Sequence, residues 1–145
     1  MDQYSKHLEV RWADLDPNFH VLHSKYYDFG AFCRMSFMNE QGLTPAFLME
    51  ARIGPVIFRE ECVFRKEIKF GDAVEVTLQA AWAHQDFGRW ALKHEIFANG
   101  KLSAHIELSG AWIDMEKRKL AQPPAMVHDV FDRIPKAPGF KFIDA

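Results

Sequence analysis

Two carboxylates and two imidazoles fall within ten residues of one another, in the segment DLDPNFHVLH at positions 14–23. A carboxylate beside free backbone N–H groups can attack an activated carbonyl or activate water, while the N–H groups stabilise the oxyanion that forms. Asp16 and the N–H of His23 are therefore a candidate pair for hydrolysing an activated acyl group. Two other interpretations stay open: Asp14, Asp16 and Asn18 are residue types that build turns and caps, and Asp and His are metal ligands, although this spacing matches no standard metal motif.

Signatures of other chemistries are absent from the sequence, which contains no GxSxG, GxxxxGK[ST], GxGxxG, HExxH or CxxC motif. Cys33 and Cys62 lie far apart, so we expect two reduced thiols. Among 145 residues, 18 Lys and Arg meet 20 Asp and Glu, and the net charge of −2 predicts no basic face for nucleic acid. No stretch approaches the roughly 20 apolar residues of a membrane span, and the first residues lack a signal peptide's apolar core. We expect one cytoplasmic domain, residues 1–145, without nucleic-acid partners or a membrane span.

Periodicity predicts the elements that position this loop. Alternation over residues 7–12 predicts a strand with Leu8, Val10 and Trp12 on one side. After the polar loop, Ser24 is the expected N-cap of a helix that ends at Gly42, and the wide apolar arc of this helix predicts burial on most sides. The loop would then deliver its side chains to the N-terminus of a buried helix.

The rest of the sequence predicts a second short helix, four long strands and a final short helix. Thr44-Pro45 starts a helix to about residue 52, and a period of two follows over 56–64, 74–82, 90–96 and 102–112, with turn signals between the strands. Residues 125–134 read as a helix before a tail rich in Pro, Gly and Phe. This order predicts an α+β fold, a curled antiparallel sheet of about five strands wrapped around a long central helix.

The segment VRWADLD at positions 10–16, continued by HVLHSKY at positions 20–26, resembles the opening motif of hot-dog-fold acyl-CoA thioesterases of the 4-hydroxybenzoyl-CoA thioesterase type. The resemblance extends to Arg34, to residues 61–64 and to FGD at positions 70–72, and it covers roughly residues 6–120. It implies the hot-dog fold, a homodimer or homotetramer with active sites at the subunit interface, and hydrolysis of an acyl-CoA thioester to free acid and CoA.

The resemblance also implies roles for particular residues. Asp16 occupies the catalytic position, as nucleophile or as general base for water, and the amide of His23 polarises the thioester carbonyl. The His23 ring matches a functional histidine in one branch of the family. Tyr26 matches the aromatic residue that follows, and His20 joins it as a substrate-binding residue. Phe19 stands where the family usually has Gly, so it is expected to narrow the acyl entrance.

The substrate sets the remaining expectations. The nucleotide of CoA is anionic and favours Arg or Lys at the mouth of a pocket, for which Arg65 and Lys66 are candidates, with solvated surface charge as the alternative. No metal and no cofactor are expected beyond the CoA moiety of the substrate. The alternative function is a non-hydrolytic acyl-CoA-binding hot-dog protein. A hydratase of this fold would carry its Asp/His pair further along the helix, where residues 35–40 read MSFMNE.

Two ionisable residues interrupt apolar strand faces. Glu60 lies between Phe58 and Cys62, and a bulge that exchanges Glu60 with Glu61 would remove it from the core. His94 interrupts another apolar face in the same way. We expect His94 to be a hydrogen-bonded core or interface histidine.

Overall fold

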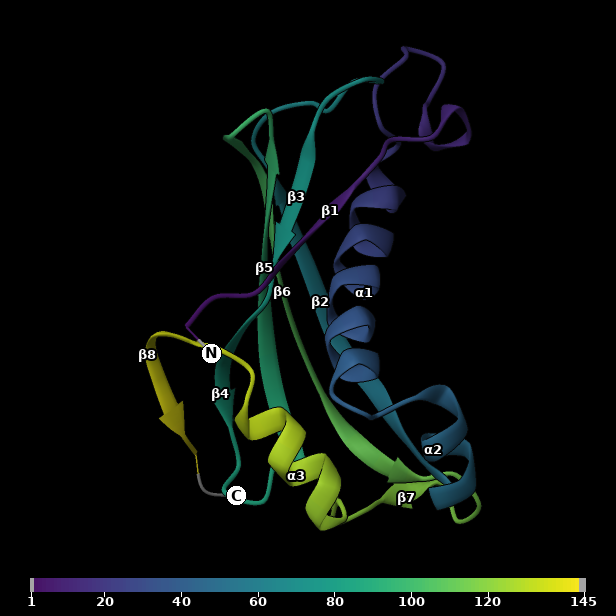
Figure 1. Ribbon diagram of the computed structural model, residues 1–145, viewed down its shortest axis with the longest axis vertical. Coiled ribbons are helices and arrows are strands. Elements are labelled where there is room, and N and C mark those ends of the chain that lie inside the picture. The colour runs from purple at the N-terminus through teal and green to yellow at the C-terminus, as the bar shows by residue number, and fades with distance from the viewer. Residues whose placement is uncertain (1, 144–145) are drawn as a thin grey trace.

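Period-two alternation builds a curled sheet, and α1 lies along one face of it (Figure 1). The structure is a computed structural model that describes residues 2–143. The elements are β1 (Ser5–Leu8), the 3₁₀ turn η1 (Trp12–Asp14), α1 (His23–Glu40), α2 (Pro45–Ala51), β2 (Ile53–Phe64), β3 (Val74–Thr77), β4 (Gln79–Ala83), β5 (Arg89–Ala98), β6 (Lys101–Asp114), β7 (Lys119–Leu120), α3 (Ala125–Asp132) and β8 (Lys136–Phe142). The predicted α+β fold, a curled antiparallel sheet with a long central helix, is confirmed.

The sheet runs β2–β6–β5–β3–β1 with every neighbouring pair antiparallel. β4 continues beside β5 after a break at Leu78, and β8 adds a parallel strand to β4. The β5–β6 hairpin turns at Asn99 and Gly100, whose φ angles are 53° and 79°. Both values fit the predicted Asn-Gly turn, because a two-residue hairpin turn of this kind needs positive φ at both positions.

Several sequence expectations are wrong in detail. The single strand expected over 74–82 is two strands, and β7 and β8 were not predicted, so the described sheet has eight strands rather than about five. Trp12 is not in a strand: β1 ends at Leu8, and Trp12 lies in η1 with 69% of its surface exposed. The reason is local, because Asp14 accepts the Arg11 N–H and folds this segment into a turn.

The central helix differs from expectation at its start and on one side. α1 begins at His23 with Leu22 as its N-cap, two residues before the predicted Ser24 cap. Gly42 follows the C-cap with φ of 101°, as predicted. The helix is not buried on most sides, since Phe32 is 51% and Met35 36% exposed. The sheet covers only the opposite face, which packs against β1, β3, β5 and β6.

Two groups of side chains form the core. Cys33 and Phe37 of α1 are fully buried over the inner face of the sheet, together with Ile96 and Ile106. At the far end of the sheet, the ring of Phe131 from α3 lies 5.3 Å from Trp112 and 5.6 Å from Trp90, centroid to centroid. The first group fixes α1, and hence its N-terminus, relative to the sheet.

Candidate active site

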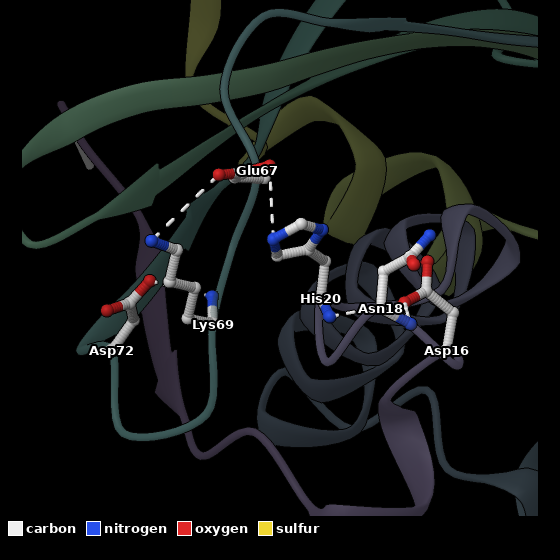
Figure 2. A network of polar contacts seen from close by, with 6 residues as sticks. All are labelled: Asp16, Asn18, His20, Glu67, Lys69 and Asp72. Carbon is white, nitrogen blue, oxygen red and sulfur yellow. Dashed lines mark hydrogen bonds and ion pairs between the residues drawn. The ribbon is translucent and has the colours of Figure 1, made fainter.

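The loop before α1 is a tight turn closed by Asp16. One carboxylate oxygen, Oδ1, accepts the N–H of Asn18 at 2.9 Å and the N–H of His20 at 3.2 Å (Figure 2). The Asp16 N–H donates to the His20 carbonyl at 2.8 Å. The other oxygen, Oδ2, has no hydrogen bond within residues 2–143. The predicted turn chemistry is therefore present, and it leaves one oxygen of a fixed carboxylate available.

Asp14 has a structural position. It is buried, and it accepts hydrogen bonds from the backbone N–H of Arg11 at 2.8 Å and from Nη2 of Arg11 at 3.0 Å. Burial by itself raises the pKa of Asp14, but the Arg11 hydrogen bonds outweigh it and hold the pKa below its ordinary value. The Asp14 carboxylate therefore caps the turn that begins at Arg11.

A second loop, residues 65–72, lies against the first. The Val21 N–H donates to the Ile68 carbonyl at 2.8 Å, and His20 pairs with Lys69 in an isolated bridge. The His20 Nε2 lies 3.3 Å from a carboxylate oxygen of Glu67 (Figure 2). These contacts bring the first loop beside the segment that carries Arg65 and Lys66, whose N–H groups both donate to the Ser103 carbonyl.

His23 is the first residue of α1, so its N–H and that of Ser24 have no partner within the helix. The Lys25 N–H already donates to the Leu22 carbonyl at 2.8 Å. The 18-residue helix places the positive end of its dipole at these two N–H groups. The arrangement is suited to binding an anion or an oxyanion.

Tyr26 is buried, whereas the sequence predicted a residue that contacts substrate. It is 4% exposed, and its ring meets Phe64 of β2 edge to face with 4.9 Å between centroids. Burial raises the pKa of Tyr26 above its ordinary value, so the hydroxyl stays protonated. Tyr26 therefore joins the first turns of α1 to the end of β2.

Phe19 has a left-handed backbone, with φ of 66°, and its side chain is 64% exposed. An L-residue in this region costs about 1–2 kcal/mol that Gly avoids. We therefore expect Phe19→Gly to be more stable than Phe19→Ala by about 1 kcal/mol, because both variants lose the ring and only Gly relieves the backbone. Urea denaturation of both variants measures the difference. An Ala variant as stable as the Gly variant would contradict the left-handed conformation.

A cluster of the buried Arg34 and His94 with the half-buried Glu60 lies between α1 and the sheet. Arg34 Nη1 is 3.2 Å from His94 Nε2 and 3.7 Å from Glu60 Oε2. The predicted exchange of Glu60 with Glu61 is wrong: the bulge falls at Ile57/Arg59, and Glu60 Oε2 remains buried. His94 is a hydrogen-bonded core histidine, as expected, with Nδ1 2.8 Å from the Thr77 carbonyl.

The sequence contained a signal for this cluster. Arg34 stands on an apolar helix face, and Glu60 and His94 each interrupt an apolar strand face. Charges on such faces are costly unless they are paired. The presence of Arg34, Glu60 and His94 on three otherwise apolar faces therefore predicts that their side chains contact one another.

Hollows flank the loop. One of about 310 Å³ lies beside the first turns of α1, with Asp14, Lys25 and Phe29 in its lining. Another of about 580 Å³ lies between residues 7–10 and 70–74. Asp16 and His23 line neither hollow. Within residues 2–143, no three His, Cys, Asp or Glu side chains are grouped to hold a metal ion.

Comparisons with known proteins agree with this architecture. DHNA-CoA thioesterase from Staphylococcus aureus superposes with a TM-score of 0.82 at 18% identity, covering 92% of this chain and 91% of that one. A 1,4-dihydroxy-2-naphthoyl-CoA thioesterase from Synechocystis gives 0.81 at 17% identity, covering 90% and 96%. A thioesterase from Thermus thermophilus, complexed with coenzyme A and Zn, gives 0.75 at 23% identity, covering 93% and 96%.

These likenesses establish the hot-dog fold. No curated protein matches the sequence significantly. None of the helices in residues 2–143 has the length and apolar character needed to cross a membrane. The model of the thioesterase-like superfamily matches residues 10–131, a span that includes the Asp16 loop, α1, α2 and strands β2 to β7. The chain belongs to the thioesterase-like superfamily.

Proposed function

We propose that this protein hydrolyses an acyl-CoA thioester to the free acid and CoA, with Asp16 as nucleophile or general base. The observation that carries the proposal is the Asp16 carboxylate, held by two N–H groups of its own loop and keeping Oδ2 without a partner in residues 2–143. This carboxylate precedes the free N–H groups at the start of α1 by seven residues. Family membership supports the same reaction class.

The helix N-terminus supplies the electrostatic part of the proposal. The N–H groups of His23 and Ser24, with the helix dipole behind them, stabilise negative charge on the thioester oxygen. A thiolate is a good leaving group, so one carboxylate and these donors suffice without a Ser-His-Asp triad. The exposed His23 ring orients water or transfers a proton beside the same carbonyl.

The other predicted residues take binding roles in this proposal. Phe19 borders the acyl entrance, while the buried Tyr26 holds the first turns of α1 against Phe64 of β2. His20, held by Glu67, fixes the loop that carries Asp16. Arg65 and Lys66 attract the phosphates of CoA. One similar protein is described as complexed with coenzyme A, which supports a CoA thioester as the substrate class.

A non-hydrolytic acyl-CoA-binding protein is the second candidate. Phe19 favours it, because a bulky side chain stands in a strained left-handed backbone three residues after Asp16, where glycine would leave more room. The two functions are separated by incubating the purified protein with acyl-CoA. Release of free thiol supports hydrolysis, whereas saturable binding without thiol release supports the binding protein.

The proposal includes a homodimer, which could pair further into a tetramer. β2 is 12 residues long, and β6 is its only strand partner within residues 2–143. Ile57, Phe58, Val63 and Phe64 of this strand are each 38–52% exposed. Long apolar edge strands are normally covered by another chain. A second copy pairing at β2 would bury this edge together with the exposed flank of α1.

We expect Val63→Lys to weaken this dimer at least about tenfold, because an edge lysine opposes strand pairing and leaves a charge in an apolar contact. Static light scattering over a dilution series measures the change. Ile143→Lys is the control, since Ile143 has similar exposure, 43%, and follows β8 on the other side of the sheet. A wild-type protein that is monomeric throughout the series would contradict the dimer.

A further inference from the structure

Three large aromatic side chains gather in the open at the end of the molecule where α1 begins. The ring of Trp12 lies 6.2 Å from Phe19 and 6.0 Å from Phe70, centroid to centroid. Their exposed fractions are 69%, 64% and 57%. We call Trp12, Phe19 and Phe70 the aromatic platform. Its members come from the two loops that also hold Asp16 and Glu67.

Packing within the chain does not account for the platform. More than half of each side chain remains in water, so most of the free energy available from burying these rings is unused. Phe19 additionally holds a left-handed backbone in this position. Clustered exposed rings at a functional loop are typical of a binding surface. Backbone strain is also concentrated at functional sites, so the left-handed Phe19 supports the same interpretation.

The charge beside the platform identifies the kind of ligand. Residues 65–69 contain Arg65, Lys66 and Lys69 against the single carboxylate of Glu67. Glu67 lies near Lys69 and His20, whereas no ion pair within residues 2–143 includes Arg65 or Lys66. A basic segment therefore leads directly into Phe70. Exposed aromatic faces next to unpaired cations match a nucleotide, whose base stacks while its phosphates meet the cations.

A groove gives the base and its ribose a place. The hollow of about 580 Å³ is lined by His7–Val10 and Phe70–Val74, so it opens directly beside the platform. Its volume lies within the range of small-molecule sites, roughly 300–1,000 Å³. The groove carries Glu9 and Asp72, whose charges repel phosphates. Asp72 already accepts the Lys69 N–H and the Asn99 amide, so Glu9 is the carboxylate that would accept from an amino or hydroxyl group of the ligand. The phosphates therefore belong on the side of Arg65 and Lys66.

We infer that Phe70 and Trp12 of the aromatic platform stack the adenine base of CoA, with Arg65 and Lys66 meeting its phosphates, while Phe19 lies toward the acyl end. This inference rests on the proposed function for the identity of the nucleotide. It places the thioester at the start of α1 and the nucleotide over the same end of the molecule. A second copy of the chain is the competing occupant of the platform.

Binding of CoA and of adenosine 3′,5′-bisphosphate, the nucleotide half of CoA, tests the inference by calorimetry. We expect Phe70→Ala to weaken the binding of both ligands at least about fivefold, since the loss of one base stacked on an aromatic ring costs this much or more. Phe70→Trp restores a flat aromatic face and should bind nearly as the wild type does. Inorganic pyrophosphate meets only the cations, so Phe70→Ala should leave its binding unchanged. Should Phe70→Ala fail to fold, Phe70→Leu replaces it, because leucine keeps apolar bulk without a ring.

The inference is overturned if the wild type does not bind the bisphosphate, or if Phe70→Ala binds CoA and the bisphosphate as tightly as the wild type does. Loss of the dimer in Phe70→Ala would also overturn it, because the platform would then be a subunit contact. The proposed function fails separately. Wild-type protein that binds CoA through Phe70 and releases no thiol refutes hydrolysis and leaves the platform standing. If the wild type releases thiol and Phe70→Ala binds CoA as tightly as the wild type does, hydrolysis stands and only the role of the platform in binding adenine is refuted.

Discussion

Asp16→Asn is expected to lower kcat for acyl-CoA hydrolysis at least about a hundredfold, because loss of an essential nucleophile or general base commonly costs that much. Asparagine keeps a carbonyl oxygen that accepts the N–H groups of Asn18 and His20, so the loop retains its turn. The change therefore removes the charge and nucleophilicity of the carboxylate with little change of shape. Thiol release at saturating acyl-CoA measures kcat directly.

Asp14→Asn is the matched control for this prediction. Asp14 is two residues away, but its carboxylate is occupied by Arg11. Its loss should reduce stability while the folded fraction keeps its kcat. An enzyme that tolerates Asp16→Asn and loses turnover with Asp14→Asn would reverse the roles assigned to the two carboxylates.

The second large effect is acid destabilisation by His94. Burial and the neighbouring Arg34 guanidinium lower the pKa of His94 from 6.5 to about 3. The unfolded chain binds the proton with the ordinary pKa, so the folded state loses stability as pH falls below about 6.5. One proton taken up only on unfolding contributes about 1.4 kcal/mol per pH unit. Urea denaturation between pH 6.5 and 5 measures this slope.

The geometry explains why His94 resists protonation. Its Nδ1–H donates to the Thr77 carbonyl, which leaves the Nε2 lone pair to accept from Arg34. A proton on Nε2 would face the guanidinium. Burial raises the pKa of Glu60, with Arg34 opposing it. Glu60 therefore stabilises the folded state as pH falls through its raised pKa, which is opposite in sign to the effect of His94.

His94→Gln provides the control for the pH series. Glutamine can donate to Thr77 and accept from Arg34 without titrating, so its unfolding free energy should vary less with pH between 6.5 and 5. Any loss of stability at pH 7 from poorer packing of the glutamine does not affect this test, because the test compares how the unfolding free energy changes with pH. Equal slopes in the two proteins would show that His94 is not the group responsible.

Much of the fold could be predicted because its signals are local. Alternation over 90–96 and 102–112 predicted β5 and β6, and Asn99-Gly100 predicted their hairpin. The open flank of α1 could not be predicted from its apolar arc. That arc indicates which residues avoid water, and it does not distinguish cover by the sheet from cover by another chain. The Pro/Gly/Phe-rich tail became β8 through parallel pairing with β4, a contact distant in sequence.

The candidate site was predictable only in part. The order of residues predicted that Asp16 would precede the start of α1, and the structure places the helix N-terminus at His23. The contact between His20 and Glu67 joins segments 47 residues apart and has no local signal. The aromatic platform likewise requires both loops to be folded. The catalytic roles of Asp16 and His23 and the cytoplasmic location stay predictions.

Thiol release from a panel of short-chain, long-chain and aromatic acyl-CoAs tests the central claim most directly. The measurement compares wild-type protein and Asp16→Asn at the same oligomeric state, determined by light scattering. We expect the wild type to turn over at least one panel member and the variant to turn it over at least about a hundredfold more slowly. A folded wild-type protein that binds these acyl-CoAs and releases no thiol, or a variant that hydrolyses them as fast as the wild type, would contradict it.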